Sequence, residues 1–364
     1  MKKALSILTV GCLAVSLAAC GSTAASSAAS AADSTASSAA ESTAAPATAA
    51  ADAQPYHICI PPPLPPPAAA DGQTYKVGIC QLVQHVALDA ATQGFKDALT
   101  EQLGDAVTFE EKNAQGDSNT CTTIINGFVS DNVDLILANA TPALQAAQAG
   151  TNTIPVLGTS VTEYGVALGI DDFDGLVGTN ISGTSDLAPL DEQAGIIKEL
   201  FPDAKTVGLL YCSAEPNSQY QVDTVKASLE ELGYTCEYYA FSDSNDLATV
   251  CQSAADASDV IYVPTDNTVA NNTEIVNNIC QPAGVPVVAG EEGIMSGCGV
   301  ATLSISYYDL GVATGKMAAK ILTGESKVEE MPIEYAPEFT KEYNPTIAEA
   351  LGITIPDDYV AYEG

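Results

Sequence analysis

Residues 205–233, KTVGLLYCSAEPNSQYQVDTVKASLEELG, contain the pattern that decides the fold. An apolar strand candidate, TVGLLYC, is followed by a polar turn and then by apolar residues at three- and four-residue spacing, Val222, Val225 and Leu229. That spacing predicts an amphipathic helix over residues 217–232. A buried strand followed by such a helix is the repeating unit of a parallel sheet whose faces are covered by helices.

The same alternation begins at Tyr75, so the chain contains two strand–helix series, the second opening at Lys205. A helix over residues 89–103 follows the first strand. We therefore predict an α/β protein with two doubly wound parallel-sheet lobes and a cleft between them. In such sheets ligands bind outside the carboxyl ends of the strands. The strand candidates are YKVGICQLV, VTFEEK, VDLILANA, IPVLGTS, TVGLLYC, TCEYYAF, VIYVPT and VPVVAGE.

The N-terminus has the features of an export signal. Two lysines precede a short apolar run that ends in LAACGS, Leu17 to Ser22. Leu-Ala-Ala-Cys resembles a bacterial lipobox, in which Cys20 is lipidated and becomes the new N-terminus. We expect a signal peptide at 1–19, followed by a lipid anchor and an Ala/Ser/Pro-rich linker at 20–73. The alternative is an unlipidated signal peptide with an incidental cysteine.

The composition excludes several functions. The chain carries 12 basic and 46 acidic residues, a formal charge of −34, and every basic residue is a lysine. Nucleic acid is not an expected partner, because phosphate binding requires a basic face. Without arginine, an anionic ligand group must be held by backbone N–H groups, hydroxyls, amides or lysine. The acidity itself is typical of a solvated surface.

Eight cysteines remain beyond the signal and the lipidation site, enough for disulfides in an exported protein. Several lie in apolar strand candidates, where cysteine behaves as a small core residue. We favour free buried thiols, and the pairing stays open. No C-x-x-C occurs and the chain has 2 histidines, so neither a metal site nor a cofactor is expected.

Polar residues at the predicted strand ends form the candidate site. They are hydroxyls, amides and carboxylates at the starts of helices, where the backbone N–H groups of the first turn point toward a cleft. The candidates are Gln84, His85, Asp89, Thr141, Thr159, Ser160, Asn217, Ser218, Asp266 and Asn267.

An ordered series of motifs between Tyr75 and Leu322 resembles a known family. The motifs are QHVALDAATQGF, ANATP, GTSVT, AEPNS, VPTDNT and GVATLSISYYDLGVATGKMAAKILTGE. They are similar to those of ABC transporter substrate-binding proteins of the tryptophan/tyrosine type, which have the periplasmic-binding-protein type I fold. The chain departs from the pattern in a proline-rich insert, 61–67, and in Thr162-Glu163-Tyr164, where a Thr-Asp-Pro is expected.

The resemblance implies a lipid-anchored solute receptor on the extracellular face of a Gram-positive type membrane. It would act as a monomer and deliver a small ligand, an amino acid and first an aromatic one, to ABC permease and ATPase subunits. Three hinge crossings are expected, near Ser182, Gly299 and Glu325. These assign 74–182 and 300–325 to the first lobe, and 183–299 and 326–364 to the second.

Ligand chemistry assigns roles to nine of these ten candidates, all but Asn267. The ammonium of an amino acid needs a buried carboxylate, for which we expect Asp266. The ligand carboxylate is expected on hydroxyls and N–H groups at Thr141, Thr159 and Ser160. Asn217 and Ser218 would close over the ligand from the second lobe, while Gln84, His85 and Asp89 would shape the side-chain pocket.

Plainer roles compete with these. Thr141, Asn217 and Ser218 can serve only as helix caps, and Asp266-Asn267 can be a turn. His85 can be a structural histidine. Glu291 and Glu292 are interpreted as a solvated pair and left out of the site.

Other functions stay open at this point. A sensor subunit can use the same fold, and peptides or purine nucleosides are alternative ligands. An exported hydrolase is disfavoured, because the sequence has no G-x-S-x-G or H-E-x-x-H motif. The absence of a G-x-x-x-x-G-K-[ST] loop assigns ATP hydrolysis to a separate subunit.

Overall fold

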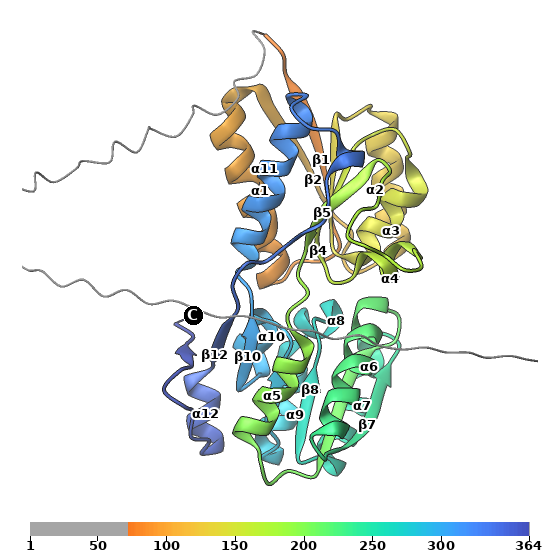
Figure 1. The fold of residues 1–364 in the computed structure, drawn as a ribbon. Coiled ribbons are helices and arrows are strands. Elements are labelled where there is room, and N and C mark those ends of the chain that lie inside the picture. The colour runs from red at the N-terminus through yellow and green to blue at the C-terminus, as the bar shows by residue number, and fades with distance from the viewer. Residues whose placement is uncertain (1–71, 364) are drawn as a thin grey trace, which may run out of the picture. The chain divides into compact units, whose positions relative to one another are not determined.

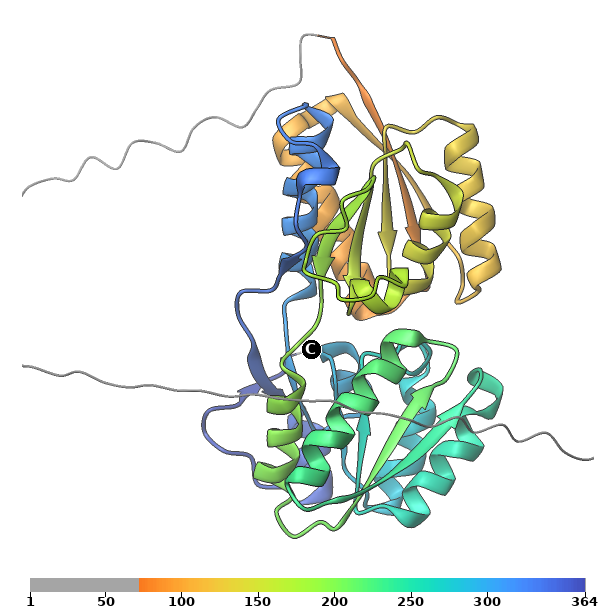
Figure 2. The same ribbon diagram turned by 45° about the vertical axis from the view of Figure 1, so that its right-hand side comes forward.

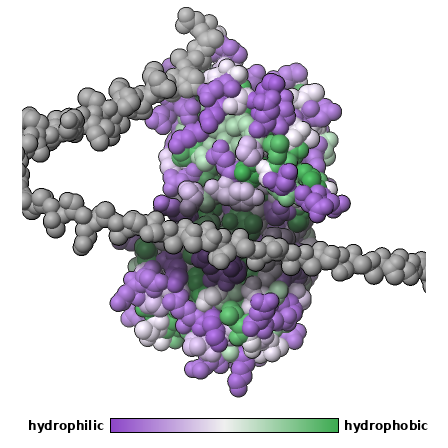
Figure 3. Space-filling view, viewed as in Figure 1, coloured by the Kyte–Doolittle hydropathy of each residue, from purple (hydrophilic) through white to green (hydrophobic). Residues whose placement is uncertain are grey.

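The structure is a computed structural model that describes residues 72–363. The predicted signal peptide, Cys20 and the linker lie outside the described residues, except for the end of the linker. No helix within 72–363 is long and apolar enough to cross a membrane. Hydrophilic residues cover much of the visible surface of both lobes, as expected for a chain of such high negative charge (Figure 3).

The first lobe is built on a six-stranded parallel sheet in the order β11-β5-β4-β3-β1-β2 (Figure 1). Its central strands β3 and β4 are buried along their whole length, because helices cover both faces. The strands are β1 (Tyr75–Gln81), β2 (Val107–Asn113), β3 (Leu135–Asn139), β4 (Val156–Val161), β5 (Ile181–Ser185) and β11 (Glu334–Tyr335). The helices are α1 (Val86–Leu103), α2 (Ser118–Ser130), α3 (Thr141–Gly150), α4 (Tyr164–Leu168) and α11 (Tyr307–Leu322).

The second lobe contains a seven-stranded sheet in the order β13-β12-β10-β9-β8-β6-β7. All its neighbouring strands are parallel except β12, which runs antiparallel to β10. The strands are β6 (Thr206–Cys212), β7 (Thr235–Phe241), β8 (Val260–Val263), β9 (Val287–Ala289), β10 (Ala301–Ser304), β12 (Thr340–Tyr343) and β13 (Val360–Ala361). The helices are α5 (Leu190–Leu200), α6 (Pro216–Glu231), α7 (Ser244–Ala257), α8 (Asn267–Ala270), α9 (Thr273–Ala283), α10 (Glu292–Cys298) and α12 (Pro345–Leu351).

Every strand candidate from the sequence corresponds to a strand, β1 to β4 and β6 to β9. The helix expected over 217–232 is α6, and the helix expected from Asp89 begins three residues earlier, at Val86. The strands that the sequence did not reveal are β5 and β10 to β13. They are two to five residues long and, unlike the equally short β8 and β9, do not lie in a longer apolar run of sequence.

The chain passes between the lobes three times, in segments that run side by side (Figure 2). The passages follow β5, β10 and β11, and each lies later than the expected crossing near Ser182, Gly299 or Glu325. The boundaries shift because short strands extend each sheet toward the hinge. Strand β10 continues the second sheet beside β9, and β11 adds an edge to the first sheet beside β5.

Helices α1 and α11 pack backbone to backbone on the first sheet (Figure 1). A Cβ atom at Gly311 would lie 2.0 Å from the carbonyl oxygen of Ala91, and one at Gly94 would lie 2.1 Å from that of Tyr308. Only glycine permits such an approach. The chain thus returns from the second lobe to complete the first.

The described cysteines are all buried free thiols. They lie in the apolar cores of the two lobes, in keeping with the core role expected for those in apolar strand candidates. Two of them, Cys251 and Cys280, lie within hydrogen-bond distance, 3.6 Å between their sulfur atoms, and are not joined by a disulfide.

Gly311→Ala is expected to destabilise the protein by about 3 kcal/mol, because the added methyl group forces α11 away from α1. Gly195→Ala is the matched control, since its helical site has no atom within 4 Å of the new Cβ. It should stabilise the protein by about 0.5–1 kcal/mol through helix propensity. Urea denaturation measures both, and equal effects of the two substitutions would contradict the close-packing argument.

Candidate functional site

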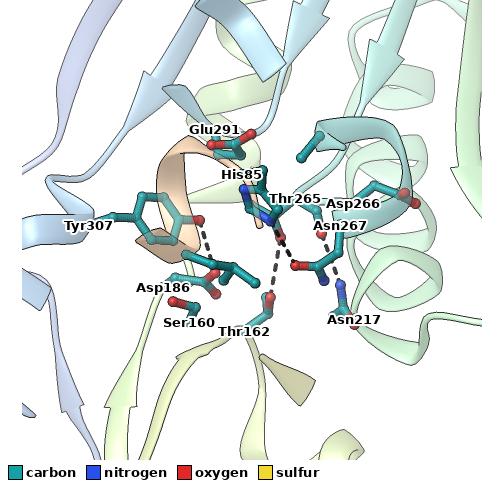
Figure 4. Close-up of a pocket in the computed structure, with 12 residues that line it drawn as sticks. His85, Ser160, Thr162, Asp186, Asn217, Thr265, Asp266, Asn267, Glu291 and Tyr307 are labelled. Carbon is teal, nitrogen blue, oxygen red and sulfur yellow. Dashed lines mark hydrogen bonds between the residues drawn. The ribbon is translucent and has the colours of Figure 1, made fainter. Parts of the chain in front are cut away.

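A pocket lies between the two lobes at the carboxyl ends of both sheets (Figure 4). Three carboxylates line it, and no lysine does. Its apolar lining consists of the side chains of Leu88 and Ala270 and the ring of Tyr307. The lining residues are His85, Leu88, Ser160, Thr162, Asp186, Asn217, Thr265, Asp266, Asn267, Ala270, Glu291 and Tyr307.

The lobes touch across this pocket. Nε2 of His85 lies 3.2 Å from Oδ1 of Asn267, and the hydroxyl oxygens of Thr162 and Thr265 lie 3.3 Å apart. The space open to the centre of a water molecule is about 10 Å³, room for roughly one water. A ligand larger than that can enter only when the lobes separate at the hinge.

Asp186 is a buried carboxylate with one free oxygen. It follows β5 directly, at the first passage between the lobes, and is 5% exposed. Its Oδ2 accepts a hydrogen bond from the hydroxyl of Tyr307 at 3.0 Å, while Oδ1 has no partner among the described residues. Burial raises the pKa of Asp186. An incoming cation would offset the cost of burying this carboxylate.

Asp266, the expected counter-ion, is instead engaged by the backbone. It is 1% exposed; Oδ1 accepts from the N–H of Val269 at 2.9 Å, and Oδ2 from that of Cys212 at 2.7 Å. It lines the pocket but acts as the N-cap of α8 and joins that turn to the end of β6. Burial and the nearby Glu215 raise its pKa.

Glu291 is not the solvated residue that the sequence suggested. It is 2% exposed and caps α10, accepting from the N–H groups of Gly293 at 2.6 Å and Ile294 at 2.5 Å. Burial raises the pKa of Glu291 to about 7, although both N–H groups favour the ionised form. Its neighbour Glu292 is half-buried. Glutamate is an uncommon N-cap, so the sequence gave no capping signal here.

Ser160 contributes an unpartnered hydroxyl from a strained backbone. Its φ is +54°, in the left-handed region, where the register between β4 and β5 shifts. The residue is 6% exposed, and its Oγ has no partner among the described residues. Strain of this kind at a pocket is typical of functional sites. The N-terminus of α1, which also faces the pocket at His85 and Leu88, has no side-chain cap.

The structure brings part of the predicted set together. The candidates that line the pocket are His85, Ser160, Asn217, Asp266 and Asn267. Those outside the lining are Gln84, Asp89, Thr141, Thr159 and Ser218.

Each residue outside the lining has a structural environment of its own. Gln84 is exposed. Asp89 accepts a hydrogen bond from Gln81 at 2.6 Å. Thr141 is buried at the first position of α3, and Ser218 is buried within α6.

Thr159 belongs to a buried cluster of three hydroxyls. Its Oγ1 lies 3.3 Å from those of both Thr184 and Thr314, which are themselves 2.8 Å apart. The cluster joins β4, β5 and α11, so Thr159 holds elements of the first lobe together.

Several lining residues were missed. Asp186 and Tyr307 lie at the hinge passages after β5 and β10. The sequence did not reveal these two strands, so the residues that follow them were not candidates. Thr162 and Thr265 follow recognised strands within the quoted motifs, so position alone could have indicated them. The missed residues are Leu88, Thr162, Asp186, Thr265, Ala270, Glu291 and Tyr307. No group of three or more potential metal ligands occurs within 72–363.

Comparisons with known proteins agree with this architecture. Residues 76–363 match the family described as ABC transporter substrate binding protein. The chain is 36% identical over 260 residues to a tyrosine-binding protein of Clostridioides difficile, covering 71% of this chain and 75% of that protein.

Two solved structures are similar over nearly their whole length. One is the ABC domain from Streptococcus pneumoniae in complex with L-Trp, with a TM-score of 0.74 and 33% identity over 78% of this chain and 99% of that one. The other is the ligand-free, open form of a substrate-binding protein from Clostridium difficile, with a TM-score of 0.61 and 38% identity over 80% of this chain and 100% of that one.

Stability should decrease as the pH rises, because the folded-state pKa of Glu291, about 7, exceeds the unfolded value of about 4.3. The contribution of buried, protonated Glu291 is complete below pH 4 and is lost as the pH passes 7. Between pH 5 and 8 the ligand-free protein should lose about 2 kcal/mol of unfolding free energy from this group. In urea titrations Glu291→Gln should lose less stability than the wild type over this range by that amount, while the raised pKa values of Asp266 and Glu342 still contribute in both proteins. An unchanged pH dependence would contradict the assignment.

Proposed function

Because the chain belongs to the family of ABC transporter substrate-binding proteins, we propose that it carries a free aromatic amino acid, tyrosine or tryptophan, between its lobes. Members of the family bind solutes and are not enzymes. The tyrosine-binding relative and the L-Trp complex support this ligand class.

The observation that carries the proposal is the free Oδ1 of Asp186. A buried carboxylate with an unpartnered oxygen, in a pocket lined by no lysine, is suited to a cation. The α-ammonium group of an amino acid supplies a single charge with three N–H donors. Asp186 therefore replaces Asp266 as the counter-ion, since both oxygens of Asp266 already accept backbone hydrogen bonds.

The ligand carboxylate needs donors other than arginine, which the chain lacks. The free hydroxyl of Ser160 supplies one of them on the first lobe. The two charged ends of the ligand would thus both bind the first lobe or its hinge.

Closure would complete the site from the second lobe. The chain superposes better on the L-Trp complex than on the open, ligand-free structure, although its sequence is more similar to the latter. The contacts of His85 with Asn267 and of Thr162 with Thr265 are those that close the pocket. In the closed form the protein would deliver its ligand to the permease, and a separate ATPase subunit would drive transport.

Asp186→Asn should lower the affinity for L-tyrosine and L-tryptophan about 100-fold, because a charge-assisted hydrogen bond is lost. Since burial raises the pKa of Asp186, wild-type affinity should fall on acidification at a higher pH than for an ordinary aspartate, and the variant should lack this dependence. Isothermal titration calorimetry at several pH values measures both effects.

Asp266→Asn is the comparison variant for this test. It should reduce stability more than affinity, because it disturbs two backbone hydrogen bonds. A folded Asp266→Asn protein that no longer binds, together with an Asp186→Asn protein that does, would return the counter-ion role to Asp266.

We also propose, from the sequence, that Cys20 carries a lipid that holds the protein on the extracellular face of the membrane. Cys20→Ser should move the protein from the membrane fraction to the medium or leave it with an unprocessed signal peptide. Fractionation with mass spectrometry of the N-terminal peptide measures this. An unlipidated Cys20 in the wild-type protein would exclude the anchor.

A further inference from the structure

The orientation of Asn267 is fixed by a buried carboxylate. Glu215, 5% exposed, accepts hydrogen bonds at Oε2 from the backbone N–H of Asn267 at 3.0 Å and from its Nδ2 at 2.7 Å. Its Oε1 accepts from the N–H and the hydroxyl of Thr268 at 2.9 and 2.7 Å. The amide nitrogen of Asn267 is therefore committed to Glu215, and its oxygen Oδ1 faces the other lobe.

This arrangement selects one tautomer of His85. Oδ1 of Asn267 can only accept, so Nε2 of His85, 3.2 Å away, carries the proton and donates it. The other ring nitrogen, Nδ1, is then a bare acceptor. It is buried and has no partner among the described residues. Burial lowers the pKa of His85, which keeps the ring neutral and Nδ1 unprotonated at neutral pH.

The two apolar side chains of the pocket belong to the two helices whose starts meet in the His85–Asn267 contact. Leu88 follows His85 by three residues at the start of α1, and Ala270 follows Asn267 by three residues in α8. Residues three apart lie on the same face of a helix. Leu88 therefore lies one helical turn after His85, and Ala270 one turn after Asn267. Figure 4 shows His85 between the group formed by Asp186, Ser160 and Tyr307 and the group formed by Asn267 and Asn217. Asp186 and His85 thus line the same pocket, and one ligand would contact both.

We propose that His85 selects ligands whose side chain carries a hydrogen-bond donor, so that the pocket accepts tyrosine and tryptophan and disfavours phenylalanine. This inference rests on the proposed function. The phenol O–H or the indole N–H satisfies Nδ1 of His85 while the ring contacts Leu88 and Ala270. Phenylalanine leaves the buried acceptor without a partner, the kind of loss on which polar sites discriminate most strongly.

The first experiment measures the dissociation constants of the wild-type protein for L-tyrosine, L-tryptophan, L-phenylalanine and 4-fluoro-L-phenylalanine. The last resembles tyrosine in size but cannot donate a hydrogen bond. Tyrosine and tryptophan should bind about 10- to 100-fold more tightly than the two ligands without a donor. Equal affinity for tyrosine and 4-fluorophenylalanine would overturn the proposal without any variant.

The second experiment repeats the series with His85→Phe and with Thr162→Val. His85→Phe should remove the preference for tyrosine, because it removes the acceptor. The dissociation constants for tyrosine and 4-fluorophenylalanine should then be about equal. Thr162→Val removes a different hydrogen bond between the lobes, at 3.3 Å, so it should weaken all four ligands alike and keep the preference.

A His85→Phe protein that still prefers tyrosine to the same degree would exclude His85 as the selecting residue. A wild-type protein that binds none of the four ligands would instead refute the proposed function itself, and the inference with it.

Discussion

The close approach of α1 to α11 is the constraint on which the rest of the structure depends. At Gly94 and Gly311 the two helices meet backbone to backbone, with no room for a side chain. One helix begins at the pocket with His85 as its N-cap, and the other begins there with Tyr307. Because α11 enters from the second lobe, this packing fixes the hinge passage, the start of each helix and the hydroxyl that binds Asp186 in one rigid unit.

Much of the fold could be predicted from the sequence, because long buried strands and amphipathic helices have a clear period. The strands β1 to β4 and β6 to β9 were recognised in this way. The lobe boundaries could not be predicted, since they depend on strands such as β10 (ATLS) and β11 (EY), which are short and lack an apolar run. Short strands are stabilised by the sheet that they join, and their own residues carry little signal.

The site was predictable only where it coincides with strand ends inside a lobe. Asp266 illustrates the limit, because its position is right for a ligand but its oxygens are used by the backbone. Asp186 shows the converse, since the polar SDLAP segment gave no sign that a hinge carboxylate would be buried with one free oxygen. Sequence position indicates which residues reach a cleft. The competition between backbone and ligand for each polar atom is decided only by the three-dimensional packing.

The free oxygen of Asp186 also makes closure conditional. When the lobes close without a cation, Oδ1 of this carboxylate has no hydrogen-bond partner among the described residues, which would favour the open form of the empty protein. On the proposed function, a bound ammonium group would reverse that balance, and the closed form would then report that the site is loaded. A transporter that recognises only the closed form would avoid hydrolysing ATP on an empty carrier. On the proposed function, one unpaired atom would thus supply an occupancy signal to the energy-consuming partner.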